Sequence, residues 1–201
     1  EIPLRLVGSE MCIRDRGDHA FVPAPLAGEA RRAVQRAIGL FVAAQQTAGG
    51  RRTGWGQQHD VLSLELAGAR NFEPAALASA ESASVLLLLM RLPDPSSEVR
   101  QAVHAAAAWL RAVALRDLAW QAGTPEAGRR LLPAPGAGAI WSRYYDARSL
   151  KPVFGDRDRS IHDDVHALSP ERRNGYAWFV TGPATAIARH AAWSMRHPAA
   201  D

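Results

Sequence analysis

Apolar residues recur at helical spacing in three long segments of the chain. Residues 28–46 carry apolar side chains near one face and arginines elsewhere, and residues 73–92 contain a continuous apolar run. Residues 96–116 repeat the pattern, with Val99 and Val103 four positions apart. This spacing is typical of amphipathic helices that bury one side. We therefore predict a helix in each of the three segments.

Local signals support these helices and add a further one. Ser96 and Glu98 form a helix-start signature, Pro74 suits a first turn, and the apolar residues after Pro183 indicate a last helix. Strand patterns are almost absent, and residues 139–146 are the best short candidate. Alternating helices and polar loops predict a mainly α fold of antiparallel helix pairs, a bundle or a toroid with at least five helices.

The composition fits one good-sized domain with a real core, because the chain has 201 residues of which 47% are hydrophobic. The longest apolar run, residues 82–90, is too short to span a bilayer. The formal net charge is +4, and all of the 24 basic residues except Lys151 are arginines. The planar arginine fork suits carboxylate or phosphate ligands, although codon usage in a GC-rich genome is the better explanation of the count.

The first residues do not follow any helix or strand period. The stretch "VGSEMCIRDR" resembles translated sequencing-adapter read-through at the end of a metagenomic gene fragment, so we expect residues 1–16 to be non-native. The only cysteine, Cys12, lies in that segment, and no disulfide framework is predicted. Residues 17–201 would then be the C-terminal part of one domain.

Two polar loops, residues 51–74 and 141–178, hold most of the remaining chemistry. The arginines and aromatic residues of most interest in them are Trp55, Arg70, Trp141, Arg143, Tyr144, Tyr145, Arg157, Arg172, Arg173, Tyr176 and Trp178. Aromatic faces stack on sugar rings and arginines bind carboxylates, which together suit an acidic polysaccharide. The same residues would suit single-stranded nucleic acid, and solvated salt-bridging turns are the plainer interpretation.

Histidine and aspartate residues in the same loops suggest a metal site only weakly. The run His162, Asp163, Asp164 and His166 offers suitable ligand types, but its spacing matches no strong metal signature. His59 and Asp60 are adjacent in sequence, and neighbours rarely converge on one ion. Surface polar groups and a capping aspartate are the favoured interpretation of both.

Four ordered motifs resemble those of the pectate lyases of polysaccharide lyase family ten. They are "GWGQQHD", "ARNFEPAALASAES", "WSRYYDARSLKPVFGDRD" and "IHDDVHALSPERRNGYAWF", between Trp55 and Phe179. The resemblance implies a helical (α/α) toroid whose long loops form the substrate cleft. It also implies calcium-dependent β-elimination of polygalacturonate, the main chain of pectin, by a secreted or periplasmic bacterial enzyme.

The resemblance also implies roles for individual residues. Arg70 of "GARNFEP" matches the arginine that acts as the base in the family. Elementary chemistry instead predicts that Arg70 binds a substrate carboxylate as a clamp, because the pKa of free arginine is above about 12 and its side chain stays protonated. Arg143 and Arg157 match substrate-carboxylate contacts. The other expected substrate contacts are Trp55, His59, Asp60, Trp141, Tyr144, Arg173 and Tyr176. For His59 and Asp60, bracing of the loop is an equal alternative.

This sequence departs from the family pattern at Arg159, where the family has glycine, and at Asp163, where it has an aromatic residue. The principal calcium-binding aspartates are expected upstream of this chain, so its metal ligands stay unknown and we expect the fragment alone to be inactive. A monomer with no nucleic-acid or membrane partner is expected. The alternative function is a non-catalytic module that binds acidic polysaccharide.

Overall fold

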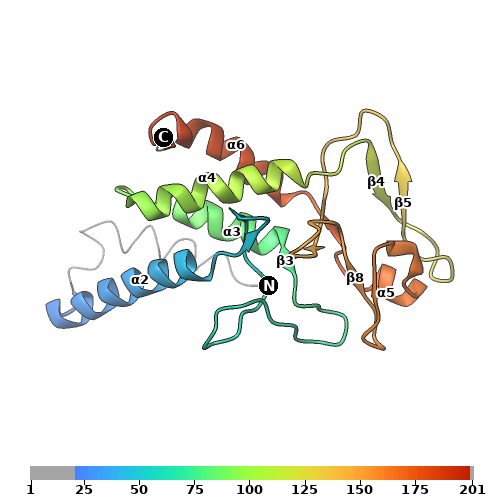
Figure 1. The fold of residues 1–201 in the computed structure, drawn as a ribbon, viewed down its shortest axis with the longest axis horizontal. Helices are drawn as coiled ribbons and strands as arrows, with labels where there is room; N and C mark the ends of the chain where they lie inside the picture. The colour runs from blue at the N-terminus through green and yellow to red at the C-terminus, as the bar shows by residue number, and fades with distance from the viewer. Residues whose placement is uncertain (1–20, 200–201) are drawn as a thin grey trace. The chain divides into compact units, whose positions relative to one another are not determined.

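The computed structural model of the chain describes residues 21–199 (Figure 1). It divides between Leu40 and Phe41 into two compact units, each of which is described by itself. The first unit contains most of helix α2 (Ala24–Ala44), which confirms the helix predicted over residues 28–46. The segment 1–16, predicted to be non-native, lies outside the described residues.

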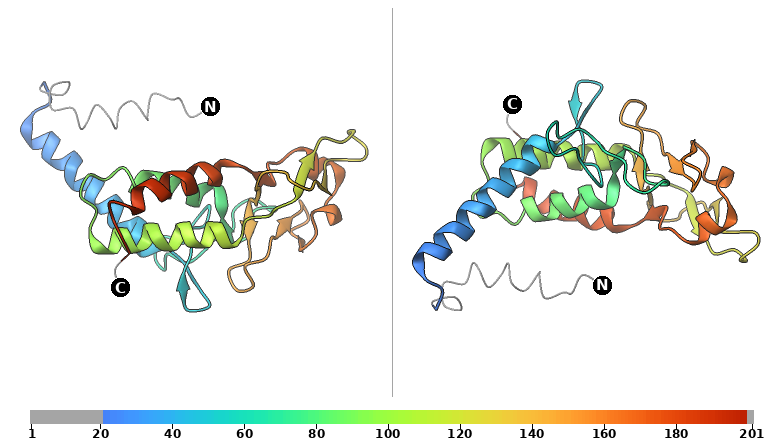
Figure 2. Two further views of the ribbon diagram at one scale, coloured as in Figure 1. Left: turned by 90° about the horizontal axis from the view of Figure 1, so that it is seen from above. Right: turned by 90° about the horizontal axis from the view of Figure 1, so that it is seen from below.

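Three helices of the second unit pack side by side: α3 (Ser79–Leu89), α4 (Ser97–Ala112) and α6 (Gly182–Ser194) (Figures 1 and 2). Both figures show α4 running antiparallel to the other two. Helix α4 begins where the sequence predicts, because the Ser96 side chain accepts a hydrogen bond from the Val99 amide at 3.3 Å. The apolar residues predicted to lie on one face of this helix are buried, as Val99 and Val103 show.

Helix α3 begins later than predicted. Residues 73–76 form a loop and Leu77–Ala78 form strand β3, which pairs antiparallel with β7 (Tyr144–Tyr145). Leu77 and Ala78 are fully buried in this pairing. The prediction of a helix from residue 73 was wrong because the strand partner lies far away in sequence and leaves no local signal.

The rest of the second unit is built from short strands, a 3₁₀ turn and one short helix. The five two-stranded sheets, all antiparallel, are β1 (Thr47–Ala48) with β2 (Arg51–Arg52), β3 with β7, β4 (Leu118–Gln121) with β5 (Arg130–Pro133), β6 (Trp141–Ser142) with β10 (Phe179–Val180), and β8 (Phe154–Gly155) with β9 (Ile161–His162). The turn is η1 (Val165–Ala167) and the helix is α5 (Pro170–Asn174).

The predicted mainly α toroid of antiparallel helix pairs is therefore wrong for this chain. Beside the three packed helices, the described residues form the several small antiparallel sheets given above. Strands of two to four residues are too short to show an alternating pattern, which is why the sequence did not reveal them. The one predicted strand, residues 139–146, contains two strands that belong to different sheets.

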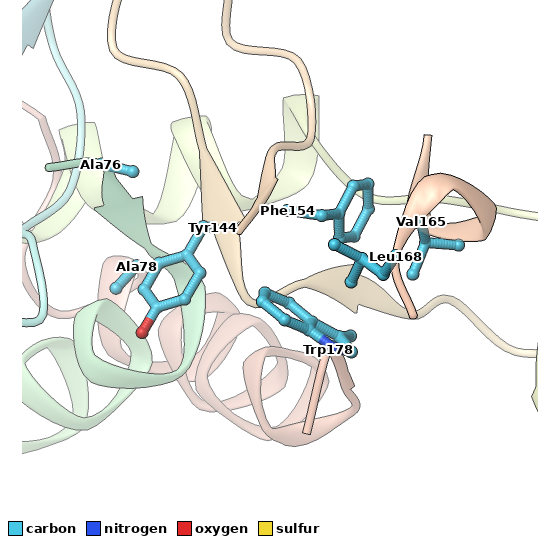
Figure 3. Packing of buried hydrophobic residues seen from close by; sticks show 7 residues of the cluster. All are labelled: Ala76, Ala78, Tyr144, Phe154, Val165, Leu168 and Trp178. Carbon is cyan, nitrogen blue, oxygen red and sulfur yellow. The ribbon is translucent and has the colours of Figure 1, made fainter. Parts of the chain in front are cut away.

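A compact aromatic and aliphatic cluster joins the small sheets (Figure 3). Its buried members are Ala76, Ala78, Tyr144, Phe154, Val165, Leu168 and Trp178. Trp178 is fully buried, and its indole Nε1 donates a hydrogen bond to the Arg172 carbonyl at 3.0 Å. The cluster thus fixes α5 and the loops around it against the strands.

Among the described residues, no helix has both the length and the apolar character that crossing a membrane would need.

Candidate functional site

Three arginine side chains surround the ring of Tyr176. The guanidinium carbons of Arg143, Arg172 and Arg70 lie 5.2, 5.6 and 5.8 Å from the ring centroid. Cations at this distance are attracted to an aromatic face. Arg70 comes from the first polar loop and the other residues come from the second, so the structure brings the two loops together here. We call Arg70, Arg143, Arg172 and Tyr176 the arginine cluster.

Arg70 forms an ion pair with Glu73, three positions further along the chain. Its Nε donates to Glu73 Oε2 at 2.9 Å and its Nη2 donates to Glu73 Oε1 at 2.5 Å. The Arg70 side chain is nevertheless 61% exposed, whereas that of Glu73 is 3% exposed. The hydrogen bonds from Arg70 lower the pKa of Glu73 to about 2, and the same contact raises the pKa of Arg70. Both groups are therefore charged at neutral pH.

A network of hydroxyl and amide groups continues from Glu73. The Tyr176 hydroxyl lies 2.9 Å from Glu73 Oε1 and 2.7 Å from the Tyr144 hydroxyl, which also donates to Gln57 Oε1. Gln57 Nε2 in turn donates to Glu73 Oε1 at 3.1 Å. Burial raises the pKa of both tyrosines, which keeps their hydroxyls protonated as donors. Tyr144 itself is buried, so of the two only Tyr176 is partly exposed.

Arg143 has a different carboxylate partner. Its Nη2 donates to Glu81 Oε1 at 2.5 Å, and the two side chains are 20% and 28% exposed. Burial lowers the pKa of Arg143, but the charge of Glu81 and the interactions with Tyr176 and Tyr144 together outweigh this, and the net pKa is raised. Counting Arg172, the three guanidinium groups face two carboxylates, which leaves one net positive charge in the arginine cluster. Such a surface suits an anionic ligand.

The other two predicted arginines lie outside this cluster. Arg157 forms a two-point ion pair with Glu171, at 2.8 Å for both contacts, and both side chains are largely exposed, at 63% and 58%. The Arg157 carbonyl accepts a hydrogen bond of 2.9 Å from the side chain of Asn71, the residue that follows Arg70. Arg173 donates to the carbonyls of Ala127 and Arg129, and so braces the loop between β4 and β5.

The two predicted tryptophans are part of the core. Trp55 and Trp141 are each 2% exposed. The indole of Trp55 donates to the Phe41 carbonyl at 2.6 Å, and that of Trp141 donates to the Leu110 carbonyl at 2.7 Å. Neither ring offers a face to a sugar in this structure, so both act as packing residues here.

His59 and Asp60 brace their own loop. His59 Nε2 accepts from the Gly56 amide at 3.0 Å, and its Nδ1 lies 2.9 Å from the Leu64 carbonyl, which requires the proton to be on Nδ1. Asp60 Oδ1 accepts from the amides of Leu62 and Ser63. These backbone hydrogen bonds lower the pKa of Asp60. Within residues 21–199 neither residue forms a hydrogen bond with Arg70, so the loop-bracing alternative describes their placement.

The described residues do not provide a set of ligands for calcium. They contain no group of three histidine, cysteine or acidic side chains that could hold a metal ion, and calcium takes six to eight oxygen ligands. The run His162 to His166 is divided between two elements, with His166 bonded to Asp164 at 3.0 Å and His162 to Ser160 at 2.8 Å. The residues of the arginine cluster therefore do not fit calcium.

Comparison with known protein families identifies the chain. The family model described as pectic acid lyase matches residues 15–187. The chain belongs to the pectic acid lyase family.

Solved structures of the same family support this assignment. The chain matches a family 10 polysaccharide lyase from Cellvibrio cellulosa with a TM-score of 0.83 and 27% identity, over 94% of this chain. An aspartate-to-alanine mutant of that lyase, in complex with trigalacturonic acid, matches with a TM-score of 0.84. This chain spans 59% of the length of those chains. Among curated proteins, none matches the sequence.

Several residues that complete the arginine cluster in this pectic acid lyase chain were not predicted as site residues. They are Gln57, Phe72, Glu73 and Glu81. Glu73 and Glu81 lie within a predicted helix, where acidic residues usually indicate a solvated face. A useful signal was available for Glu73, because it follows Arg70 by three positions in "ARNFEP", at a distance where opposite charges can pair.

Backbone strain accompanies a departure from the family pattern near the cluster. Arg159, where the family resemblance leads us to expect glycine, has a φ of 72°, a conformation that favours glycine. Its Nε donates to Asn71 Oδ1 at 3.1 Å. Close packing also requires Gly155 nearby, because a Cβ there would lie 2.6 Å from the Phe72 carbonyl oxygen.

This strain predicts an unusual order of stability. We expect Arg159→Gly to have a higher free energy of unfolding than Arg159→Ala by about 1 kcal/mol, because both lose the side chain and only glycine relieves the positive φ. Denaturant unfolding of the two variants measures the difference. The same pair of substitutions at Arg148, whose φ is not in the positive region, should show the usual order with alanine more stable. Alanine being the more stable at both positions would contradict the prediction.

Proposed function

We propose that the protein to which this chain belongs is a pectate lyase that cuts polygalacturonate by β-elimination. Three observations support the proposal. The chain belongs to the pectic acid lyase family, a similar structure is in complex with trigalacturonic acid, and the arginine cluster gathers guanidinium groups that suit uronate carboxylates. The exposed guanidinium of Arg70 beside Tyr176 is the observation that carries the most weight.

Elimination sets clear demands on the site. A base takes the proton from C5 of the uronate, the electron pair of that bond forms the C4–C5 double bond, and the glycosidic oxygen leaves C4 with its bonding pair and gains a proton. The C5 proton becomes acidic only when the negative charge that develops on the neighbouring carboxylate is stabilised. We propose that Arg143 and Arg172 provide this stabilisation.

Arg70 is proposed as the group that takes the C5 proton. Because Glu73 raises the pKa of Arg70, the neutral base exists only at strongly alkaline pH unless further positive charge is brought near it. The same ion pair also fits the alternative role, in which protonated Arg70 binds a carboxylate of the substrate. Arg157 is proposed as a more distant substrate contact, together with Tyr176, because both retain exposed surface.

Calcium is proposed as a requirement of the complete enzyme, with its ligands outside the described residues. A secreted or periplasmic location in a bacterium and a monomeric state complete the proposal. They follow from the family resemblance.

A non-catalytic module that binds acidic polysaccharide is the second candidate. The observation that favours it is that Arg70 and Arg143 are each paired with a carboxylate and have raised pKa values, so both are charged forks in this structure. Such a module would bind polygalacturonate without changing it.

A product assay separates the two functions. The complete protein, incubated with polygalacturonate and calcium at alkaline pH, should form the unsaturated uronate, detected by its ultraviolet absorbance, and a chelator should stop the reaction. This chain alone should form none. Fully methyl-esterified pectin is the matched control, because it keeps the sugar chain and lacks the carboxylates that arginines bind. Binding of polygalacturonate by the complete protein without any unsaturated product would favour the binding module instead.

A further inference from the structure

The ion pair between Arg70 and Glu73 is asymmetric in a way that its counterparts are not. The Arg70 side chain is 61% exposed and the Glu73 side chain 3% exposed, whereas Arg157 and Glu171 form a similar two-point pair with both partners more than half exposed. An exposed pair contributes little and is easily exchanged with water. A buried carboxylate beneath an exposed guanidinium instead presents that guanidinium at the surface.

Glu73 is also fully occupied by donors. Its Oε1 receives hydrogen bonds from Arg70 Nη2, Gln57 Nε2 and the Tyr176 hydroxyl, and its Oε2 receives them from Arg70 Nε and the Arg70 backbone amide at 3.2 Å. A buried carboxylate needs such partners to remain charged. Because all of them converge on one side chain, rotation of Glu73 would break the whole set. Its position, and hence that of the Arg70 fork, is fixed.

This arrangement determines which nitrogen of Arg70 can meet a ligand. Nε and Nη2 are taken by Glu73, and Nη1 has no hydrogen-bond partner within residues 21–199. The Phe72 ring, 4.7 Å from the guanidinium carbon, supports the same orientation from one face. We infer that Glu73 is a positioning residue, whose buried carboxylate holds Arg70 by its Nε–Nη2 edge and leaves Nη1, together with the second N–H of Nη2, to meet the substrate.

The inference rests on the proposed function and adds a second effect to it. The negative charge of Glu73 raises the pKa of Arg70 and so moves the formation of neutral Arg70 to higher pH. Glu73 therefore fixes the geometry of Arg70 and also makes its neutral, proton-accepting form scarcer at any given pH. A substitution of Glu73 that removes the charge and keeps the side-chain size tests both effects, because the geometry affects kcat and the charge affects the pH profile.

Glu73→Gln in the complete enzyme is the central experiment. We expect the plateau value of kcat to fall about tenfold or more, because the amide donates where the carboxylate accepted and Arg70 loses its fixed edge. We expect the alkaline rise of kcat to move to lower pH, because the pKa of Arg70 falls once the neighbouring charge is gone. A purely structural role would lower the amount of folded enzyme without moving the pH profile.

Two variants act as controls. Glu73→Asp keeps the charge on a shorter side chain, so its alkaline rise should stay near that of the wild type while its plateau kcat falls. Glu171→Gln removes the carboxylate from the exposed ion pair with Arg157, so it should leave the alkaline rise where it is, whatever it does to KM. If Glu73→Gln does not fold, Glu73→Asp still tests the positioning role through its plateau kcat.

A chemical readout does not depend on lyase activity. Phenylglyoxal modifies neutral guanidine through the two Nη atoms, and Glu73 both covers Nη2 and disfavours the neutral form. The modification rate of Arg70, followed by mass spectrometry of the complete enzyme, should rise about tenfold in Glu73→Gln for each unit by which the pKa falls.

These measurements distinguish failure of the inference from failure of the proposed function. Wild-type enzyme that forms no unsaturated product would refute the lyase function, while faster modification of Arg70 in Glu73→Gln would still support the positioning role. An active wild type together with a Glu73→Gln variant of unchanged kcat, pH profile and modification rate would overturn the inference.

Discussion

Replacing Arg70 by alanine in the complete enzyme is expected to lower kcat by about 10²- to 10⁴-fold and to change KM little. The reason is that a group that takes a proton acts mainly in the transition state, whereas substrate is also held by other arginines of the cluster. Steady-state kinetics on polygalacturonate at saturating calcium measure both constants. Circular dichroism must show that the variant is folded, because Arg70→Ala leaves the buried Glu73 carboxylate without its ion-pair partner.

The matched control is Arg157→Ala, which removes another exposed arginine from a two-point ion pair. Because Arg157 lies outside the arginine cluster, we expect it to raise KM and to leave most of kcat. If Arg70→Ala gave that same pattern, Arg70 would be a carboxylate clamp and the base would be another residue. The ion pair with Glu73, which raises the pKa of Arg70, makes this comparison the decisive test of its role.

The elements that could be predicted from the sequence are those whose signal is local. Helix α4 has its start signature at Ser96 and its buried face in one run of residues, and helix α6 begins beside Pro183 as expected. The start of α3 was missed because Leu77 and Ala78 pair with a strand more than sixty residues away. Pairings of that kind are set by tertiary contacts, which override local helix propensity.

The same division applies to the candidate site. Arg70, Arg143 and Tyr176 were recognised from their motifs, and the structure places all three in the arginine cluster. Trp55 and Trp141 looked like sugar contacts because aromatic residues in polar loops often are, yet their rings are buried and their indoles bond to backbone carbonyls. Whether an aromatic ring is buried depends on the packing of distant segments, which composition does not reveal.

A group of histidines between α4 and α6 was also invisible in the sequence, because its members lie far apart. Arg111 Nη2 lies 2.9 Å from His190 Nδ1, His190 Nε2 lies 3.1 Å from His104 Nδ1, and His104 Nε2 lies 2.8 Å from the His197 carbonyl. Since Arg111 can only donate, Nδ1 of His190 must be unprotonated, and the chain of donors then runs from Arg111 to the His197 carbonyl. The indole ring of Trp193 packs against both His104 and His190.

This arrangement predicts that acid destabilises the packing of α4 against α6. His190 is 6% exposed, and burial, followed by the charges of Arg111 and His104, lowers its pKa to about 4 from 6.5. The unfolded chain therefore binds a proton between these two pKa values that the folded protein does not. Stability should be complete above pH 6.5 and fall as the pH drops towards 4, by about 3 kcal/mol in all from this residue. Denaturant unfolding at several pH values between 7 and 4 measures the loss.

The substitution His190→Gln isolates the contribution of this histidine. Glutamine can accept from Arg111 through its oxygen and donate to His104 through its nitrogen, but it does not bind a proton in this range. We expect the variant to be less stable than the wild type at pH 7, because its packing is poorer, and to lose less stability on acidification. His162→Gln, in the hairpin of β8 and β9, should keep the steep wild-type dependence. A His190→Gln variant as sensitive to acid as the wild type would show that other carboxylates or histidines govern the acid limit, and that the donor chain from Arg111 tolerates a protonated His190.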